Sequence, residues 1–155
     1  MLRHLGALPS VDHASDPEDV KLPGSATVQA TVDFIIGLLN DAINCPDFPG
    51  RISDKDLANW DGRMTKAGAM ALKARVLLFV ASPLFNDNAP YCDGEASSSL
   101  MTWFGGYNKE RWKDAINACE EFFTALNQNG YYKLVEVGDN GTSDVRGAYT
   151  SAYYD

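Results

Sequence analysis

The sequence has few basic side chains and no long apolar run. Its 13 Lys and Arg residues stand against 21 Asp and Glu, which leaves a net charge of -8. A surface of this sign repels phosphate backbones, so the composition argues against a nucleic-acid partner. No uninterrupted apolar stretch reaches the roughly 20 residues that cross a bilayer. The sequence therefore predicts a chain without a membrane span.

The first residues lack the features of an export signal. Pro9, Asp12, Asp16 and Glu18 stand where the core of a secretory signal is apolar. The three cysteines show no CxxC spacing, and an odd number cannot all pair within one chain. We expect neither a signal peptide nor a lipid-anchor cysteine in this sequence.

Patterns typical of catalysis and metal binding are also missing. The sequence contains no GxSxG, HExxH or P-loop pattern. His4 and His13 have no Cys or Asp at ligand spacing, which argues against zinc. Two acidic loop clusters leave paired-acid glycosidase chemistry or a calcium site as alternatives, although acidic loop residues are mostly just solvated. These clusters are Asp54, Asp56 and Asp61, and Asp139 and Asp144. We predict that the protein is not an enzyme and has no cofactor or metal.

The chain does contain enough apolar residues for one folded unit, because 45% of its 155 residues are hydrophobic. Residues 1–24 hold prolines and acidic residues without a regular period, and we predict an extended lead-in there. Residues 25–134 carry the apolar periodicity and form the predicted helical core. Residues 135–155 show no core pattern and are predicted to be an irregular tail.

Three segments of the core repeat apolar residues every three to four positions, which is the spacing of amphipathic helices. They start at Ser25, Thr65 and Asn108 and end before Pro46, Pro83 and Gly130. Small residues in the second helix predict a central helix packed on most sides, and Trp112 is predicted to lie in the core. Without convincing strands, the sequence predicts an all-α fold, a helical hairpin array with long loops that is similar to tetratricopeptide (TPR) repeats.

Three stretches of the sequence carry a family resemblance. The run from Gly62 to Asn86, GRMTKAGAMALKARVLLFVASPLFN, resembles the signature segment of SusD/RagB-type proteins, the surface glycan-binding lipoproteins of Bacteroidetes polysaccharide-utilisation systems. LGALPSVDHA followed by SATVQATVDFIIGLLNDAI resembles the segment before it, and RWKDAINACEEFFTALNQNGYYKL resembles the helix after it. The resemblance covers most of the chain from Leu5 to Leu134, and it implies an internal or truncated part of a SusD-like α-α superhelix.

The resemblance also implies a function. SusD-like proteins bind polysaccharides or oligosaccharides without cleaving them and pass them to a SusC-like TonB-dependent transporter, so the expected location is the surface of the outer membrane. A second interpretation remains open. The segment is then a helical scaffold that contacts the transporter or the missing remainder of its own chain, and it has no sugar site.

Aromatic residues in the predicted loops are the candidate glycan contacts. Flat aromatic rings pack on the C–H faces of pyranose rings, while amides and carboxylates bind the hydroxyl groups around them. The predicted contacts are Trp60, Tyr91, Trp103, Tyr107, Asn88 and Asp93, with Asn59, Asp61 and Asn86 beside them. The alternative is that Trp60 and Trp103 anchor their loops onto the helices. The sequence does not identify the glycan.

Overall fold

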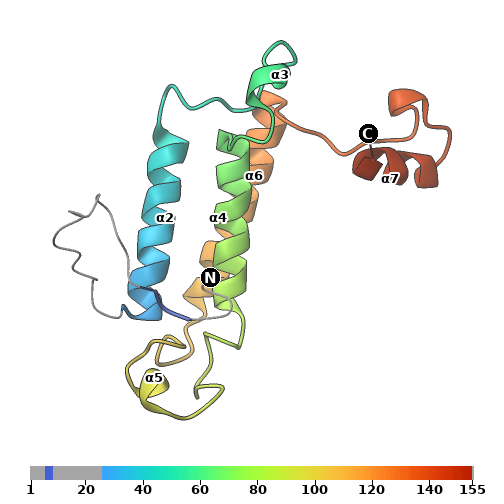
Figure 1. Cartoon of the computed structure of the whole chain (residues 1–155). Helices are drawn as coiled ribbons and strands as arrows, with labels where there is room; N and C mark the ends of the chain where they lie inside the picture. The colour runs from blue at the N-terminus through green and yellow to red at the C-terminus, as the bar shows by residue number, and fades with distance from the viewer. Residues whose placement is uncertain (1–5, 9–25, 155) are drawn as a thin grey trace.

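A computed structural model describes residues 6–8 and 26–154, and every regular element in these ranges is a helix (Figure 1). The elements are α2 (Val28–Asn44), α3 (Leu57–Trp60), α4 (Lys66–Ala81), α5 (Glu95–Ser98), α6 (Glu110–Asn129), the 3-10 helix η1 (Asp139–Gly141) and α7 (Val145–Tyr154). The predicted all-α fold is confirmed. Most of the predicted lead-in lies outside the described residues.

The first two predicted helices begin at hydroxyl caps. The Thr27 side chain accepts a hydrogen bond from the backbone N–H of Ala30 (3.1 Å), so α2 begins slightly later than Ser25, the predicted start. Thr65 caps α4 as predicted, because its Oγ1 accepts from the N–H of Gly68 (3.2 Å). The N–H groups of Lys66 and Ala67 donate to carbonyls of the preceding loop, at 2.8 and 3.3 Å. The loop before α4 is therefore fastened to the start of that helix.

The third predicted helix ends as predicted and begins one residue later, at Glu110, with Lys109 at the N-cap position and no side-chain cap. Asn108 Oδ1 accepts a hydrogen bond from the N–H of Glu110 (2.9 Å) at the start of α6. At its end Gly130 has a left-handed backbone (φ 60°, ψ 34°), and its N–H bonds the carbonyl of Leu126 (2.9 Å). The local sequence sets the C-terminal end of this helix.

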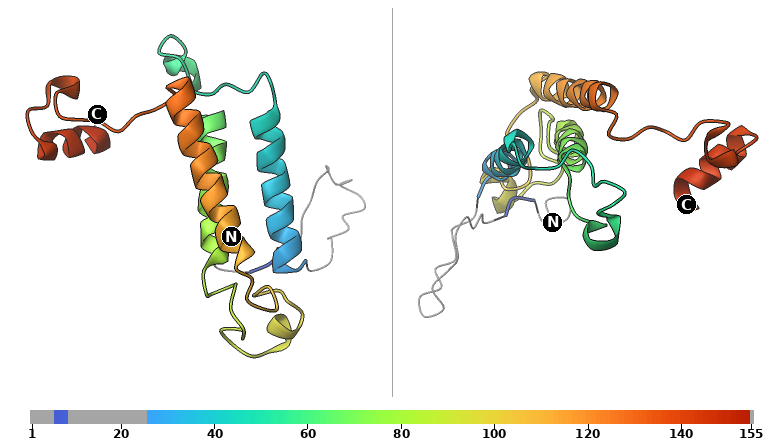
Figure 2. Two further views of the ribbon diagram at one scale, coloured as in Figure 1. Left: turned by 180° about the vertical axis from the view of Figure 1, so that it is seen from behind. Right: turned by 90° about the horizontal axis from the view of Figure 1, so that it is seen from above.

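The helices α4 and α6 form an antiparallel hairpin, and α2 packs on α4 (Figures 1 and 2). Alanines on both helices of the hairpin are buried, which lets the two backbones approach closely. They are Ala67, Ala69 and Ala74 on α4 and Ala115 and Ala118 on α6. A second buried cluster joins α2, α4 and the chain beyond α4. Its buried members are Ala7, Val28, Val32, Val80 and Phe85.

One prediction about packing is confirmed and one is wrong. The helix α4 is central, because it contacts both α2 and α6, and of its residues only Leu72, Arg75 and Leu78 are exposed. Trp112 is not a core residue, because it is 36% exposed on α6. The physical reason is that the contact between α4 and α6 uses the small residues, so the large apolar side chains of α6 lie beside the contact and remain open to solvent.

The prediction of an irregular tail is also wrong, because α7 and η1 form within residues 135–155. Asp144 starts α7: its carboxylate accepts from the N–H of Gly147 (2.6 Å), and its carbonyl accepts from Ala148 (3.0 Å). Of the elements described, α7 packs only against η1. Figure 2 shows this C-terminal segment lying away from the three long helices.

An exposed ion pair holds the turn before α7, and we expect it to make that turn sensitive to pH. The Asp139 carboxylate lies 2.7 Å from Lys133 Nζ and also accepts from the N–H of Glu136 (3.1 Å). The bond from Lys133, then that from Glu136, lowers the pKa of Asp139 below its usual 3.8. The bond to Asp139 raises the pKa of Lys133 above 10.5.

The contribution of Asp139 is therefore fully present above pH 3.8 and is lost as the pH falls through the lowered pKa. The contribution of Lys133 is present below pH 10.5 and is lost as the pH rises through its raised pKa. An NMR titration of Asp139 should give a pKa that moves up toward 3.8 in Lys133→Ala. An unchanged pKa in that variant would show that the ion pair does not form.

Candidate functional site

The structure separates the predicted glycan contacts into two groups at opposite ends of the long helices. Trp60 ends α3, close to where α4 begins, whereas the other five lie on the connection that carries α5 (Figure 1). The six residues therefore cannot form one site. Which of them contact sugar stays a prediction, and the two groups have to be judged separately.

The connection at residues 83–108 holds its aromatic residues in different ways. Tyr91 and Tyr107 are 83% and 53% exposed, and Asn88 and Asp93 are also exposed. Trp103 is half-buried, and its indole Nε1 donates to the carbonyl of Ser97 (2.9 Å). Trp103 thus fits the alternative interpretation in which the ring anchors its own loop.

Asn86 is a structural residue and not a sugar contact, which corrects its place beside the predicted site. It is 2% exposed, and its Nδ2 donates to the carbonyls of Ala81 (3.3 Å) and Asn108 (3.0 Å). Its Oδ1 accepts from the N–H of Asn108 (2.7 Å) and from Arg111 (3.2 Å). The side chain joins the end of α4 to the start of α6 and has no group left for a ligand.

Trp60 lies in a hollow of about 810 Å³ between the loop after α2 and the start of α4. The hollow is lined by Phe48, Pro49, Arg51, Ile52, Ser53, Asp56, Trp60, Arg63 and Met64. The indole is 47% exposed, and the Arg63 guanidinium carbon lies 4.0 Å from its ring centre. A cation over one ring face stabilises it there and leaves the remaining surface of the ring for a ligand. The hollow combines an apolar floor with polar groups, as small-molecule sites usually do.

Polar groups near Trp60 are already oriented by local bonds. Ser53 Oγ donates to Asp56 Oδ2 (2.7 Å), and Arg51 lies 3.4 Å from Asp54. The free lone pairs of Asp56 and the remaining N–H groups of the arginines can meet hydroxyl groups of a ligand. The arrangement provides an aromatic face with hydrogen-bonding groups around it.

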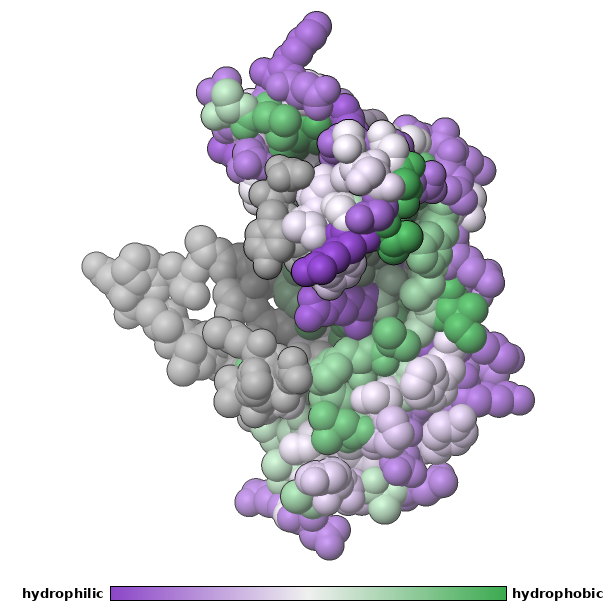
Figure 3. Space-filling view, turned by 90° about the vertical axis from the view of Figure 1, so that its right-hand side faces the viewer, coloured by the Kyte–Doolittle hydropathy of each residue, from purple (hydrophilic) through white to green (hydrophobic). Residues whose placement is uncertain are grey.

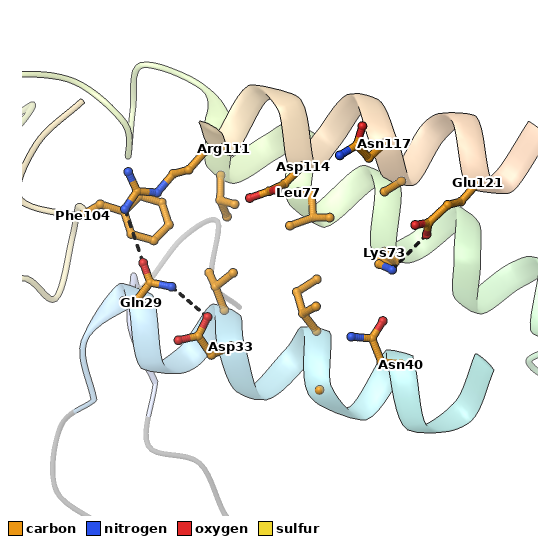
Figure 4. Close-up of a pocket in the computed structure, with 15 residues that line it drawn as sticks. Gln29, Asp33, Asn40, Lys73, Leu77, Phe104, Arg111, Asp114, Asn117 and Glu121 are labelled. Carbon is orange, nitrogen blue, oxygen red and sulfur yellow. Dashed lines mark hydrogen bonds and ion pairs between the residues drawn. The ribbon is translucent and has the colours of Figure 1, made fainter. Parts of the chain in front are cut away.

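A second concavity, of about 480 Å³, is a polar groove between α2 and α6 with α4 as its floor (Figure 4). Carboxylate and amide side chains from α2 and α6 line it, among them Asp33, Asn40, Asp114 and Asn117. Lys73 of α4 closes one side through an ion pair with Glu121 (3.2 Å). Within the described part of the chain, the side chains of Asn40 and Asn117 make no hydrogen bond.

Arg111 closes the other end of this groove. Its guanidinium carbon lies 3.9 Å from the ring centre of Phe104, and its N–H groups reach Asn86 (3.2 Å) and Gln29 (3.4 Å). Partial burial lowers the pKa of Arg111, and the charges of Asp114 and Asp33 oppose this shift. Arg111 remains a cation, because a guanidinium group is protonated at neutral pH. It links α6 to α2 at this end of the groove.

The sequence reasoning missed this groove. Gln29, Asp33 and Asn40 of α2 are spaced by four and seven residues, which places them on one helix face. Arg111, Asp114 and Asn117 are spaced by three on α6 and also share a face. The polar periodicity was available in the sequence, but only the fold shows that the two faces meet.

The described residues hold no group of three or more His, Cys, Asp or Glu side chains placed to bind a metal ion. His4 and His13 lie outside these residues. Within residues 6–8 and 26–154, no helix has the length and apolar character needed to cross a bilayer.

Comparison with solved structures finds a similar protein. BT4246 of Bacteroides thetaiotaomicron superposes with a TM-score of 0.70 at 28% sequence identity, over 86% of this chain and 23% of BT4246. The selenomethionine form of BT4246 gives a TM-score of 0.63 at 30% identity, over 86% of this chain and 22% of that one. The chain thus spans less than a quarter of the length of BT4246. No protein-family model and no curated protein sequence matches it.

Proposed function

We propose that the chain is part of a SusD/RagB-type protein and binds polysaccharide or oligosaccharide without cleaving it. The captured glycan passes to a SusC-like TonB-dependent transporter at the surface of the outer membrane, as a step of nutrient uptake. The resemblance of residues 5–134 to SusD-like segments supports the family, and the similarity to a longer Bacteroides protein supports the all-α fold.

One observation carries the sugar-binding part of the proposal. Trp60 is a half-exposed aromatic ring in a hollow of about 810 Å³, with Ser53, Asp56 and Arg63 around it. A pyranose needs a flat apolar surface for its C–H groups and donors and acceptors for its hydroxyls, and this hollow offers both. Its volume falls within the roughly 300–1,000 Å³ that is usual for ligand sites. Capture by stacking breaks no bond and requires no nucleophile.

The proposal predicts that Trp60→Ala lowers glycan affinity by about tenfold or more, because the central aromatic of a binding site contributes more than about 1 kcal/mol. Isothermal titration calorimetry with starch, inulin, xylan, mannan and host-type glycans measures this change. Tyr91→Ala is the matched control, since it removes an exposed aromatic at the other end of the helices. Its affinity should equal that of the unsubstituted chain.

Two outcomes would contradict this assignment. A loss of affinity in Tyr91→Ala and Tyr107→Ala, with none in Trp60→Ala, would move the site to the connection at residues 83–108. New reducing ends in the bound glycan would show cleavage and overturn the non-catalytic proposal.

A second candidate function is favoured by a different observation. Large apolar side chains of α6 are exposed, Ile116 at 55% and Phe123 at 61%. Exposed apolar surface of this kind marks a protein contact. In this alternative the chain is a helical scaffold, without a sugar site, that contacts the transporter or the remainder of a longer chain. The absence of heat with every glycan in the calorimetry would favour it.

A further inference from the structure

The helix α6 carries an apolar seam that nothing covers within the described residues. The seam consists of Trp112, Ile116, Cys119 and Phe123, of which the tryptophan, isoleucine and phenylalanine are 36%, 55% and 61% exposed. With Leu78 of α4 it borders a hollow of about 220 Å³. Figure 3 shows hydrophobic residues reaching the surface at several places between hydrophilic ones.

The spacing of the seam matches a helix that packs along another helix. Its four residues are separated by four, three and four positions, which are the steps between a and d positions of a heptad. A helix laid along such a seam crosses it at about 20°, with side chains of each inserting between those of the other. Of the described elements only α4 packs closely on α6, and it does so through Ala115 and Ala118. The seam is therefore free for a further helix.

The separations between the seam residues, four, three and four positions, read the same from either end of α6. An antiparallel copy of α6 therefore places Trp112 opposite Phe123 of the second copy, and Ile116 opposite Cys119 of the second copy. Such pairing is symmetric, as a two-fold interface requires. Both copies contribute the same surface, and each exposed aromatic is covered by the other copy.

Charges beside the seam select this orientation. Lys113 and Glu120 each follow a seam residue by one position, so both lie on the same flank of α6. In the antiparallel pair, Lys113 of each copy faces Glu120 of the other, which gives two opposite-charge contacts. In a parallel pair, Ala115 of one copy would lie opposite Glu120 of the other, and no opposite-charge contact would form. Lys113 lies 2.9 Å from Glu110 in the single chain, but this exposed pair is weak and can exchange.

We propose that the α6 seam docks on a second copy of this chain, with the two α6 helices antiparallel. This inference does not rest on sugar binding, because the seam and the Trp60 hollow share no residue. The proposal concerns the surface, its spacing and its charge pattern alone.

Sedimentation velocity over a series of protein concentrations tests this proposal. We expect a reversible dimer whose dissociation constant rises by about tenfold or more in Ile116→Glu, where a charge enters the seam. Asn117→Glu is the matched control, because it adds the same charge to the groove side of α6, and its dimer should persist. Circular dichroism checks that each variant is folded. A monomer at all concentrations, or a dimer that Ile116→Glu leaves intact, would overturn the proposal and leave the seam to a different partner.

Charge exchange and cross-linking test the orientation. Lys113→Glu should weaken the dimer, and adding Glu120→Lys should restore it. The test uses a background of Cys45→Ser and Cys92→Ser, with oxidised glutathione added as the oxidant. In this background the Ile116→Cys variant should form a disulfide to Cys119 of the second copy much faster than the background chain forms one. Rapid cross-linking of the background itself would place two Cys119 side chains together, as in a parallel pair, and would overturn the antiparallel arrangement.

Discussion

Replacing Asn86 by alanine is expected to lower the free energy of unfolding by about 3–5 kcal/mol, because it leaves several buried polar groups without partners. The Asn86 side chain is 2% exposed and makes four hydrogen bonds, to Ala81, twice to Asn108, and to Arg111. Each unpaired buried group costs about 1–3 kcal/mol. The change also loosens Arg111, which borders the groove between α2 and α6.

Urea denaturation followed by circular dichroism measures this loss. Asn88→Ala is the matched control, since Asn88 is an exposed asparagine on the same connection and its substitution should change stability by less than about 0.5 kcal/mol. Equal stabilities of the two variants would mean that Asn86 does not join α4 to α6. The comparison also separates a structural asparagine from a solvent-exposed one, which the sequence alone did not do.

Replacing Phe85 by alanine is expected to cost about 3–5 kcal/mol, because it empties the centre of the second buried cluster. Phe85 is 3% exposed, and its ring meets Phe79 edge-on at 5.2 Å between ring centres. It packs with Val28 of α2 and Val80 of α4, and its carbonyl accepts from the N–H of Phe104 (3.0 Å). The substitution therefore loosens the contact between α2, α4 and the connection that follows.

Thermal unfolding should show this loss as a lowered midpoint. Leu84→Ala is the neighbouring control, because Leu84 is 41% exposed and its truncation removes little buried surface. If Leu84→Ala destabilised the chain as much as Phe85→Ala, the connection would have to be packed with the opposite face inward.

The limits of the long helices could be predicted because local chemistry sets them. Thr65 offers a hydroxyl at the start of α4, Pro83 blocks its continuation, and Gly130 adopts the left-handed conformation that ends α6. These signals act within a few residues and do not depend on the rest of the fold. The apolar periodicity between them gave the three helices and the all-α class.

The relative positions of the helices could not be predicted in the same way. Trp112 follows the apolar period of α6, but the contact with α4 uses the alanines, and this choice depends on how closely two backbones approach. The helix α7 has apolar residues at helical spacing, Val145, Ala148 and Tyr149, but it is only 10 residues long and its start depends on the Asp144 cap. A short helix of this kind is difficult to distinguish from a loop in sequence.

The candidate site could likewise be predicted only in part from the sequence. Aromatic and polar residue types identified Trp60 as a candidate sugar contact, but only the fold shows the hollow around it and its distance from the connection at residues 83–108. Trp103 and Asn86 have equally suitable side chains, and tertiary hydrogen bonds commit both of them to structure. The sequence shows which side chains have groups that can bind sugar. Whether those groups are free to bind a ligand depends on contacts with residues far away in the sequence.

The central claim is that Trp60 binds glycan, and the indole N–H signals of the protein test it most directly. The chain has three tryptophans, so a nitrogen-15 correlation spectrum gives three resolved indole signals, each assigned by a Trp→Phe variant. On titration with the glycan panel, we expect the Trp60 signal to shift and saturate while those of Trp103 and Trp112 stay in place. A saturable shift of Trp103 without Trp60, or no shift of any indole signal with any glycan, would contradict the claim.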